Sequence, residues 1–319
     1  MRRMFFLTAL LLMLTAVLPL LALRLLTRAP TSDAETALTV LSDGQIVETT
    51  MADWLPGVVA AEMPASFEPE ALKAQAVAAR TFLLEHRQNR PESHPEADVC
   101  DDPVCCCAHQ NDDTLLENWG EDASKNLRRV RAAAEGTDGQ ILTYEGAPIL
   151  AAFHSSSRDK TEDSAALWGA VPYLVSVSTP ETAENVPGFQ SVVTFSPDEL
   201  KSAILGERPE AVFSEDPAEW IGEIALDDGG RVGSITIANE TFSGAALRSI
   251  LNLRSAAFTA EFKDGSFTFT ATGHGHGVGM SQYGANVMAQ QGSNYMEILA
   301  HYYPGTELIT PDAKTPRLG

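Results

Sequence analysis

The chain has 319 residues, of which 43 are Asp or Glu and 22 are Lys or Arg, so its formal net charge is −21. A surface this acidic repels nucleic acid and anionic lipid, and we expect neither as a partner. Hydrophobic residues make up 44% of the sequence, which is enough to build one or two domains with their own cores.

The first segment, from Met4 to Leu23, is an uncharged apolar run flanked by Arg3 and Arg24. A helix of about twenty such residues spans the hydrocarbon core of a bilayer. A cleavable signal peptide would have a shorter apolar centre and small residues at a cleavage site. That alternative stays open, but the sequence favours an uncleaved single-pass anchor over residues 1–28. Because the later sequence contains no comparable run, we expect the body of the protein to lie on one side of the cell membrane, outside the cytoplasm.

After a polar linker over residues 29–36, hydrophobic periodicity and turn residues predict short strands and separate helices. Asp43-Gly44 and Asp264-Gly265 are each flanked by alternating apolar residues, which is typical of hairpins. Met63-Pro64 ends one predicted helix and Pro69 begins the next. In chain order the predicted elements are strands 38–42 and 45–50, helices 51–62, 69–88 and 124–134, strands 140–144 and 148–154, helix 197–205, hairpins around 228–230 and 264–265, and helices 281–291 and 294–303.

This mixture of antiparallel hairpins and separated helices predicts an α+β fold rather than a doubly wound parallel sheet. We expect a main core formed by residues 37–190 and 270–310. A smaller α+β subdomain over residues 191–269 would be inserted into this core, and residues 311–319 would form a C-terminal tail.

Glu62 is the first candidate for chemistry, because it ends a predicted helix among apolar neighbours. The C-terminal end of a helix carries partial negative charge, which disfavours a carboxylate, and apolar burial acts in the same direction. Both effects raise the pKa, as a general acid that works near neutral pH requires. From position alone, a surface glutamate at a helix end is the simpler interpretation.

Lys73 and Arg80 lie seven residues apart, so they share one face of the helix predicted over 69–88. Direct contact with Glu62 would lower the pKa of that carboxyl. We therefore expect the two cations to face an acidic or polar substrate. An ordinary solvated basic face is the alternative.

One polar segment holds every cysteine together with two histidines: His94, Cys100, Cys105, Cys106, Cys107 and His109. Exported chains usually form disulfides, but bridges between adjacent cysteines are strained. A tetrahedral zinc site accepts mixed Cys and His ligands from one loop, and with four protein ligands it would be structural. Zinc is the favoured interpretation, with disulfides and free thiols as the alternatives.

Two further segments carry glycines, histidines and hydroxyls. The run from Gly273 to Tyr283 is rich in glycine, which lets backbone approach a ligand closely, and Ser281 can cap the helix that follows. His274 and His276 are candidate metal ligands or proton carriers, or one of them is a buried, hydrogen-bonded residue of a turn. The segment 154–164 offers serines and carboxylates that could line a polyol-binding groove, or it is an ordinary polar loop.

The order of these segments resembles the stage II sporulation protein D family. The resemblance rests on several long motifs in one order and covers about Ala37 to Leu308. The motifs are Trp54-Leu55-Pro56-Gly57-Val58-Val59-Ala60-Ala61-Glu62-Met63-Pro64, Ala71-Leu72-Lys73-Ala74-Gln75-Ala76-Val77-Ala78-Ala79-Arg80-Thr81, Asp98-Val99-Cys100-Asp101, Phe153-His154-Ser155-Ser156-Ser157, Pro172-Tyr173-Leu174 and the run from Gly273 to Ala285.

The resemblance implies a lytic transglycosylase, which cuts peptide-free peptidoglycan strands between N-acetylmuramic acid and N-acetylglucosamine. It implies that Glu62 is the catalytic residue and that the main core is the catalytic one. It implies a structural zinc ion held by His94, Cys100, Cys105 and Cys106. As partners it implies glycan strands, a peptide-stripping amidase and membrane partners of a wall-remodelling complex. The substrate-binding residues that follow from it are Lys73, Arg80, His154, Ser155, Ser157, Asp163, His276, Ser281, Gln282 and Tyr283.

The chain departs from the family pattern at three places. A ligand that is often histidine falls on Cys105, which gives one histidine and three cysteines and leaves Cys107 spare; both ligand sets bind zinc. Where the pattern has Gly-Gly, this chain has Arg158-Asp159, and a loop that needs positive φ would lose its glycines. Where the pattern has a large aromatic residue before Gly-His-Gly, this chain has His274.

Two other functions stay open, and the Arg158-Asp159 departure makes the first of them credible. The second hypothesis is a non-catalytic module that binds cell-wall glycan within an anchored complex. The third is a metal-dependent amidase or peptidase that uses His274 and His276, although the sequence places no carboxylate ligand beside that pair.

Overall fold

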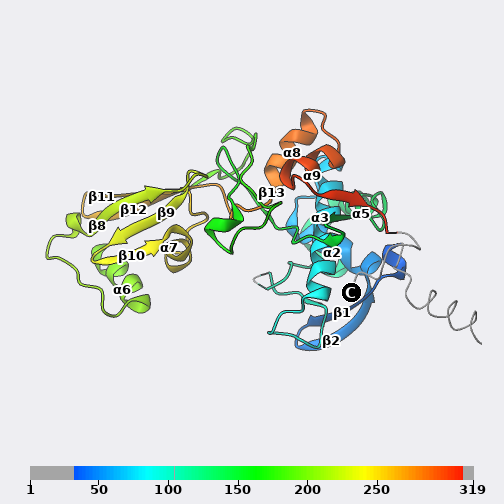
Figure 1. The fold of residues 1–319 in the computed structure, drawn as a ribbon, viewed down its shortest axis with the longest axis horizontal. Helices are drawn as coiled ribbons and strands as arrows, with labels where there is room; N and C mark the ends of the chain where they lie inside the picture. The colour runs from blue at the N-terminus through cyan, green and yellow to red at the C-terminus, as the bar shows by residue number, and fades with distance from the viewer. Residues whose placement is uncertain (1–31, 104, 312–319) are drawn as a thin grey trace, which may run out of the picture.

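The structure, a computed structural model, describes residues 32–103 and 105–311. The chain forms two lobes joined by loops, a larger lobe around the long helix α3 and a smaller lobe of strands and short helices (Figure 1). Each lobe has its own cluster of buried apolar side chains. The mixed α+β architecture is confirmed. The cluster of the smaller lobe is drawn from residues 200–271, while the domain boundaries themselves stay a prediction.

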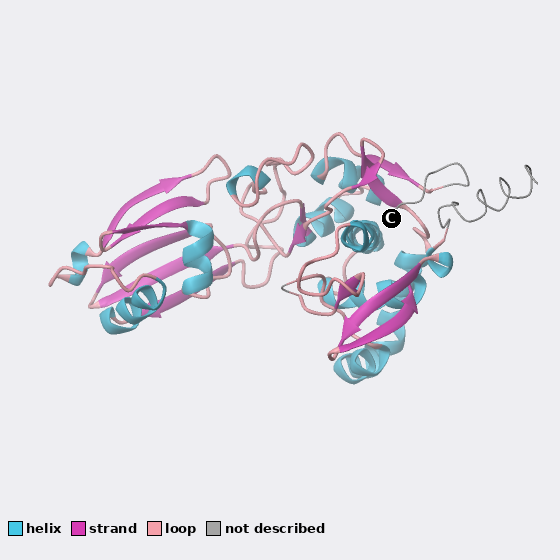
Figure 2. Ribbon diagram, turned by 60° about the horizontal axis from the view of Figure 1, so that its bottom comes forward, coloured by secondary structure: helices cyan, strands magenta, loops and turns pink. Residues whose placement is uncertain are grey.

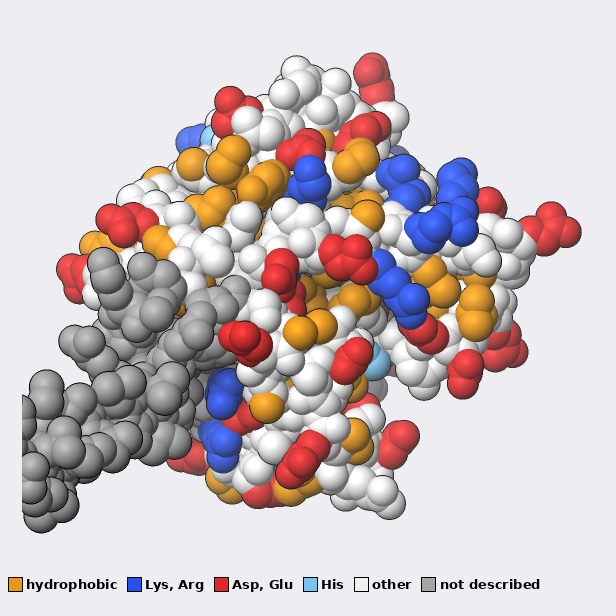
Figure 3. Space-filling model, turned by 90° about the vertical axis from the view of Figure 1, so that its right-hand side faces the viewer, with side chains coloured by type: hydrophobic (Ala, Val, Ile, Leu, Met, Phe, Trp, Pro, Cys, Tyr) orange, Lys and Arg blue, Asp and Glu red, His pale blue; other side chains and the backbone are white. Residues whose placement is uncertain are grey.

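The predicted membrane anchor over residues 1–28 lies outside the described residues, as does most of the predicted tail. Within the described ranges, every helix is too short or too polar to cross a bilayer. On the face of the larger lobe drawn in Figure 3, acidic side chains are spread widely and are mixed with smaller groups of lysine and arginine. This distribution fits the formal net charge of −21.

The larger lobe starts with a hairpin and continues through packed helices with short strands at their edges (Figures 1 and 2). Its elements are η1 (Asp33–Glu35), β1 (Ala37–Ser42), β2 (Gln45–Thr50), α2 (Met51–Glu62), α3 (Pro69–Gln88), β3 (Val99–Cys100), α4 (Asp112–Trp119), η2 (Gly120–Asp122), α5 (Ala123–Glu135), β4 (Ile141–Tyr144), β5 (Ala147–Pro148), β6 (Phe153–His154), η3 (Ser164–Ala166), β13 (Met280–Ser281), α8 (Gln282–Gln290), α9 (Tyr295–Tyr302) and β14 (Glu307–Ile309).

Local sequence signals set the limits of the first elements. Asp43 and Gly44 both have positive φ, 50° and 73°, which a tight two-residue hairpin turn requires. The Thr50 side chain accepts a hydrogen bond from the backbone N–H three residues on and so caps α2. The helix ends at Glu62, because Met63 adopts an extended conformation before a proline.

Helix α3 is the centre of the larger lobe. Helices α2, α5, α8 and α9 all pack against it. Small side chains allow this close approach on several sides of one helix, and five buried alanines of α3 contribute: Ala71, Ala74, Ala76, Ala78 and Ala79. The predicted bounds of α2 and α3 are confirmed, and α5 is one residue longer at each end than predicted.

Arg80 lies in this core and does not face a substrate. Its side chain is 1% exposed. Nε and Nη2 donate to the two carboxylate oxygens of Asp33, each at 2.7 Å, and further bonds reach the backbone carbonyls of Ala134 and Gln140. The prediction that Arg80 binds substrate is therefore wrong, because its donors are used to tie the N-terminal turn to α3 and α5.

Asp33→Ala would leave the Arg80 guanidinium buried without its charged partner. We expect the free energy of unfolding to fall by about 3–5 kcal/mol, measured by urea denaturation. Arg131→Ala is the matched control, since it removes an ion pair with Asp112 in which both side chains are about half exposed, and it should change stability by less than about 1 kcal/mol. Equal losses in the two variants would contradict the central role of the buried pair.

The smaller lobe holds two antiparallel three-stranded sheets, ordered β11-β12-β7 and β10-β9-β8. Its strands and short helices are drawn in Figure 2. The helix predicted at 197–205 is present and extends to Glu207, and Ser196 and Glu199 form a capping box at its start. The elements are β7 (Gln190–Phe195), α6 (Pro197–Glu207), η4 (Pro217–Glu219), β8 (Ile221–Leu226), β9 (Val232–Ile237), β10 (Glu240–Ser243), α7 (Gly244–Ile250), β11 (Phe258–Lys263) and β12 (Ser266–Thr272).

Short strand pairings bring distant candidate segments together. Strands β6 and β13 pair in parallel, with Phe153 opposite Met280 and His154 opposite Ser281. An antiparallel bridge joins Ser156 to His274. The glycine-rich run therefore lies directly against the segment that starts at His154.

Candidate active site

A groove of about 780 Å³ lies where the end of α2, the cysteine-rich loop and the glycine-rich run meet. Its lining includes Glu62, Cys105, His154, Trp168, His276 and Gln282. Among the described residues that line it, Glu62 is the single carboxylate, and none is a lysine or arginine. The groove thus joins three of the clusters that the sequence singled out.

The Glu62 carboxyl is held by two hydrogen bonds. The backbone N–H of Ala108 donates to Oε1 at 3.0 Å, and Gln282 Nε2 donates to Oε2 at 3.5 Å. Burial raises the pKa of Glu62, while the bonds from Ala108 and Gln282 favour the ionised form and lower it by less. The pKa therefore lies above its ordinary value of 4.5, and the prediction that burial raises it is confirmed.

Gln282 reaches Glu62 from the first turn of α8. Its side chain is almost fully buried, and Nε2 also lies 3.5 Å from Oε1 of Gln75 on α3. Gln75 is completely buried and its own Nε2 has no partner among the described residues. The Gln282 amide thus contacts both the Glu62 carboxyl and Gln75 on α3. The sequence analysis did not identify Gln75 as part of the site.

Four side chains of the cysteine-rich segment could hold a metal ion. The ligand atoms of His94, Cys100, Cys105 and Cys106 lie within 4.8 Å of one another. In a tetrahedral site with bonds of about 2.3 Å, ligand atoms are separated by about 3.7 Å. His94 Nε2 lies 3.4 Å from both Cys105 Sγ and Cys106 Sγ, so the donor set and its spacing fit such a site.

The ring of His94 is oriented for this role. Its Nδ1 lies 3.3 Å from the backbone carbonyl oxygen of Ala97. A carbonyl only accepts, so Nδ1 carries the hydrogen and Nε2 presents its lone pair to the sulfurs. All four cysteines lie within the described residues and none forms a disulfide, so the disulfide alternative is not supported. Cys107 is buried outside the cluster, as the spare cysteine.

His154 uses both ring nitrogens within the protein. Nδ1 lies 3.2 Å from the Val278 carbonyl oxygen, so Nδ1 carries the hydrogen, and Nε2 accepts from the Ser157 hydroxyl at 2.6 Å. Burial lowers the pKa of His154 well below its ordinary value, so the ring is neutral. His154 therefore braces the glycine-rich run and has no free nitrogen for a sugar hydroxyl.

Arg231 reaches the same network from the smaller lobe. Its side chain is 4% exposed, Nη2 donates to Ser157 Oγ at 2.7 Å, and Nη1 donates to the Lys160 carbonyl at 3.2 Å. The Ser157 hydroxyl accepts from Arg231 and donates to His154. Gly277 has a φ of +90°, and a Cβ there would lie 2.5 Å from Arg231 Nη2, so this position leaves room for the guanidinium.

Glu181 is another buried residue that the sequence analysis missed. Its Oε1 accepts from the Ser157 backbone N–H at 2.7 Å and from the Ser281 hydroxyl at 2.5 Å. Its Oε2 accepts from the Thr179 hydroxyl. Glu181 and Arg231 together fix Ser157, and no local motif marks either residue.

The predicted substrate-binding residues divide into two groups. Four of them line the groove: His154, Ser155, His276 and Gln282. The other six lie outside its lining: Lys73, Arg80, Ser157, Asp163, Ser281 and Tyr283. Their positions do not support a direct substrate contact.

Each of the remaining five outside the lining has another visible role. Lys73 bonds Glu70 on its own helix at 2.7 Å. Asp163 caps the turn η3, and Tyr283 packs edge-on against a phenylalanine. Ser157 and Ser281 use their hydroxyls in the buried network around Glu181 and His154.

Within the pair Arg158-Asp159, the second residue has the positive φ that a glycine adopts readily. Asp159 has a φ of +59°, a conformation that Asp adopts more readily than most residues. Arg158 Nη2 donates to the Gly230 carbonyl at 2.6 Å, in the turn between β8 and β9. Neither residue lines the groove, so the departure from the family pattern falls outside it.

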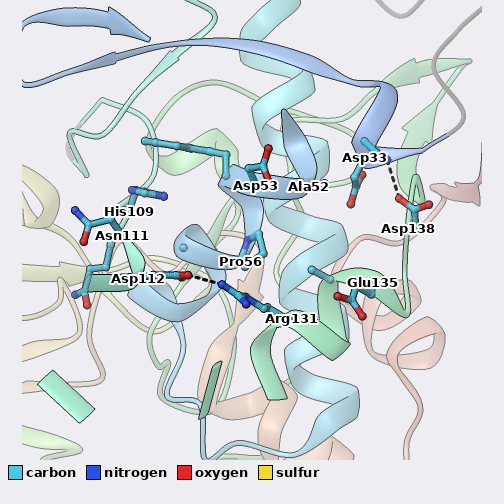
Figure 4. A pocket seen from close by; sticks show the side chains of 15 residues that line it. Asp33, Ala52, Asp53, Pro56, His109, Asn111, Asp112, Arg131, Glu135 and Asp138 are labelled. Atoms are coloured by element: carbon cyan, nitrogen blue, oxygen red, sulfur yellow. Dashed lines mark hydrogen bonds and ion pairs between the residues drawn. The ribbon is translucent and has the colours of Figure 1, made fainter. Parts of the chain in front are cut away.

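A second hollow, of about 760 Å³, lies between α2 and α5 and does not contain Glu62 (Figure 4). Four of its five acidic side chains have partners: Asp33 pairs with Arg80, Asp53 accepts from Thr50, Asp112 pairs with Arg131, and Asp138 accepts from the Asp33 backbone N–H. The fifth, Glu135, is exposed, so the described lining of this hollow offers no partly buried acid with a raised pKa like Glu62.

A family model and two relatives that share one name point to the same family. A family model described as stage II sporulation protein matches residues 42–144. Stage II sporulation protein D of Bacillus amyloliquefaciens is 38% identical over 275 residues, 85% of this chain and 78% of that protein. The protein of the same name from Bacillus subtilis (strain 168) is 37% identical over 264 residues, 82% of this chain and 75% of its relative. The amidase enhancer of Bacillus subtilis is 28% identical over 308 residues, 80% of this chain and 40% of the relative.

An α+β chain with a partly buried acid beside a candidate metal loop is thus matched along most of its length by sporulation proteins. The chain belongs to the stage II sporulation protein D family. The resemblance drawn from the sequence motifs is confirmed.

The raised pKa of Glu62 makes its stability contribution depend on pH. In the folded chain the ionised form is disfavoured, so stability is lost as pH rises through the folded pKa. Glu62→Gln removes that charge, and we expect it to raise the melting temperature near pH 7. The gain should vanish below about pH 4, where Glu62 is protonated in both states.

Glu70→Gln is the matched control of opposite sign. Burial raises the pKa of Glu70, but the bonds from Lys73 and the Tyr295 backbone outweigh it, so the pKa is lowered. The contribution of the Glu70 carboxylate to folding stability is therefore present at neutral pH, and it is lost as pH falls through the pKa of the folded state. Glu70→Gln should therefore lower the melting temperature near pH 7. Calorimetry between about pH 4 and pH 7 measures the melting temperatures of both variants. A lower melting temperature for Glu62→Gln than for the wild type at neutral pH would contradict a raised pKa of Glu62.

Proposed function

We propose that this chain is a peptidoglycan lytic transglycosylase that cleaves peptide-free glycan strands between N-acetylmuramic acid and N-acetylglucosamine. The observation that carries the proposal is the Glu62 carboxyl, partly buried with a raised pKa in a groove whose described lining has no second carboxylate. Ordinary glycosidases use two carboxyl groups, about 5–9.5 Å apart. A lytic transglycosylase needs one, because the nucleophile belongs to the substrate.

The reaction proceeds in two proton transfers through one residue. Protonated Glu62 donates its proton to the glycosidic oxygen as the bond to the muramoyl C1 breaks. The ionised carboxylate then takes the proton from the C6 hydroxyl, whose oxygen attacks C1 and closes a 1,6-anhydro ring. The bonds from Ala108 and Gln282 hold the carboxylate during the interval in which it is charged.

A structural zinc ion completes the proposal. His94, Cys100, Cys105 and Cys106 would hold it with no open position, so it would fix the loop and take no part in bond cleavage. Ala108, which bonds Glu62, follows this cluster by two residues. Zinc would therefore act on catalysis through the position of the Ala108 N–H.

The setting that we propose is wall remodelling at the outer side of the cell membrane, with residues 1–28 as a single-pass anchor. The names of two relatives support a sporulation role, and the name amidase enhancer supports an amidase as a partner. We propose engulfment as the sporulation step and a peptide-stripping activity for the amidase. Such an amidase would supply the peptide-free strands. Membrane partners of the same complex complete this proposal.

Two other functions are less well supported. A non-catalytic glycan-binding module was suggested by Arg158-Asp159, but both residues lie outside the groove lining and leave Glu62 in place. A metal-dependent amidase would use His274 and His276. Within the part of the chain that the structure describes, the one group of three or more potential metal ligands excludes both histidines.

Glu62→Gln should reduce the release of 1,6-anhydro products from peptide-free glycan by about 10²–10⁴-fold, because the amide cannot donate a proton to the leaving oxygen. Mass spectrometry of the products measures the loss, and the melting temperature shows that the variant is folded. Glu70→Gln, outside the groove, should retain activity. An unchanged rate in Glu62→Gln would overturn the mechanism, and glycan binding by the wild type without anhydro products would select the binding module.

Cys100→Ala should lower the zinc content of the purified protein from about one ion per chain to well below one, and should lower its melting temperature, because three ligands remain. Cys107→Ala is the matched control: this buried cysteine lies outside the cluster, so the zinc content should not change. Elemental analysis measures the metal. A full zinc complement in Cys100→Ala would contradict the assigned ligand set.

A further inference from the structure

Trp168 is an exposed aromatic side chain on the wall of the groove. Its side chain is 52% exposed, whereas Trp54 and Trp220 are buried and Trp119 is partly buried. Single exposed apolar residues are common on protein surfaces and need no explanation. Trp168 differs from such residues because it lines the same groove as Glu62.

The loop that carries Trp168 is held rigidly by one buried serine. The Ser164 backbone N–H donates to the Leu174 carbonyl at 2.9 Å, and its own carbonyl accepts from the Trp168 N–H at 2.8 Å. The Ser164 hydroxyl accepts from the Val171 N–H at 2.9 Å. The indole is therefore presented from a fixed backbone, so little backbone entropy is lost when a ligand contacts it.

His276 extends the surface that Trp168 offers. The two ring centroids are 5.0 Å apart at an interplanar angle of 55°. Nδ1 of His276 accepts from the Val278 N–H at 3.1 Å. Burial lowers the pKa of His276 to about 4, so the ring is neutral at physiological pH. Together the rings form an uncharged aromatic corner in the groove.

The chemistry of the lining selects the kind of ligand. No lysine or arginine is among the described lining residues, so an anion would find no counter-charge in the lining, and Glu62 is the single carboxylate. The face of an indole carries partial negative charge and attracts polarised C–H groups. A sugar ring presents such C–H groups on one face and hydroxyls around its edge.

We propose that Trp168 and His276 form a stacking subsite for an uncharged N-acetylated hexosamine of the glycan strand, in the same groove as Glu62. The subsite would hold a neutral sugar of the strand and so align the neighbouring glycosidic bond with the carboxyl. This inference rests on the proposed function, because it takes the glycan as the ligand of the groove.

The test uses the full chain carrying Glu62→Gln and a tetramer of N-acetylglucosamine as the probe, with affinity measured by ligand-observed NMR. We expect Trp168→Ala to weaken binding about tenfold, since stacking is lost, and Trp168→Phe to recover most of the affinity. Trp119→Phe, which changes a tryptophan outside the groove lining, should bind as tightly as its parent. Because Trp168 is exposed, both Trp168 variants should keep the melting temperature of their parent.

The outcomes separate this subsite from the proposed reaction. Equal affinity in Trp168→Ala and its parent would overturn the subsite, as would a lack of tetramer binding by the folded parent. The transglycosylase reaction is tested in a separate experiment, which measures anhydro products from peptide-free glycan with the protein that retains Glu62. If those products were absent while tetramer binding still depended on Trp168, the subsite would stand and the transglycosylase reaction would fall.

Discussion

The hydrogen bond from the Ala108 backbone N–H to Glu62 Oε1 joins two parts of the chain that carry different kinds of chemistry. On one side is the end of α2, whose burial keeps the carboxyl protonated to a higher pH. On the other is a loop with little regular structure of its own, gathered around His94 and three cysteines. A loop of this kind gains order from a bound metal rather than from packing alone. The exactness with which the acid is placed therefore depends on how firmly the cysteine cluster is held.

Much of the fold could be predicted because its signals are local. Asp43-Gly44 allows the tight turn, Thr50 caps α2, and Pro69 begins α3, and each acts within a few residues of the chain. Helices α4 and α7 were missed, although Asn111 and Ser243 cap them, because both helices are short, with eight and seven residues. The strand β14 was missed as well, since its pairing with β4 depends on residues distant in sequence.

The site was predicted less evenly, and the reason is again distance along the chain. The burial of Glu62 follows from its immediate neighbours, and the cysteine ligands lie in one segment. By contrast, Arg80 was predicted to face a substrate, because nothing near it in sequence shows that its partner is Asp33, which lies 47 residues away. Arg231 and Ser157 are 74 residues apart and belong to different lobes. Glu181 and Arg231 stand in no recognisable motif, so only the folded chain shows that they support the histidine beneath the glycine-rich run.

The guanidinium of Arg231 has a consequence for how such chains can change over time. It passes from the smaller lobe into a space that Gly277 leaves open, and it ends on Ser157 of the larger lobe. Recombination that replaced the smaller lobe by that of a relative would also replace Arg231, whereas Gly277 and Ser157 would be kept. Chimeric chains should therefore fold stably only when the donated lobe carries a cation at the position of Arg231. A substitution at Arg231, Gly277 or Ser157 would restrict which residues the other two positions can accept.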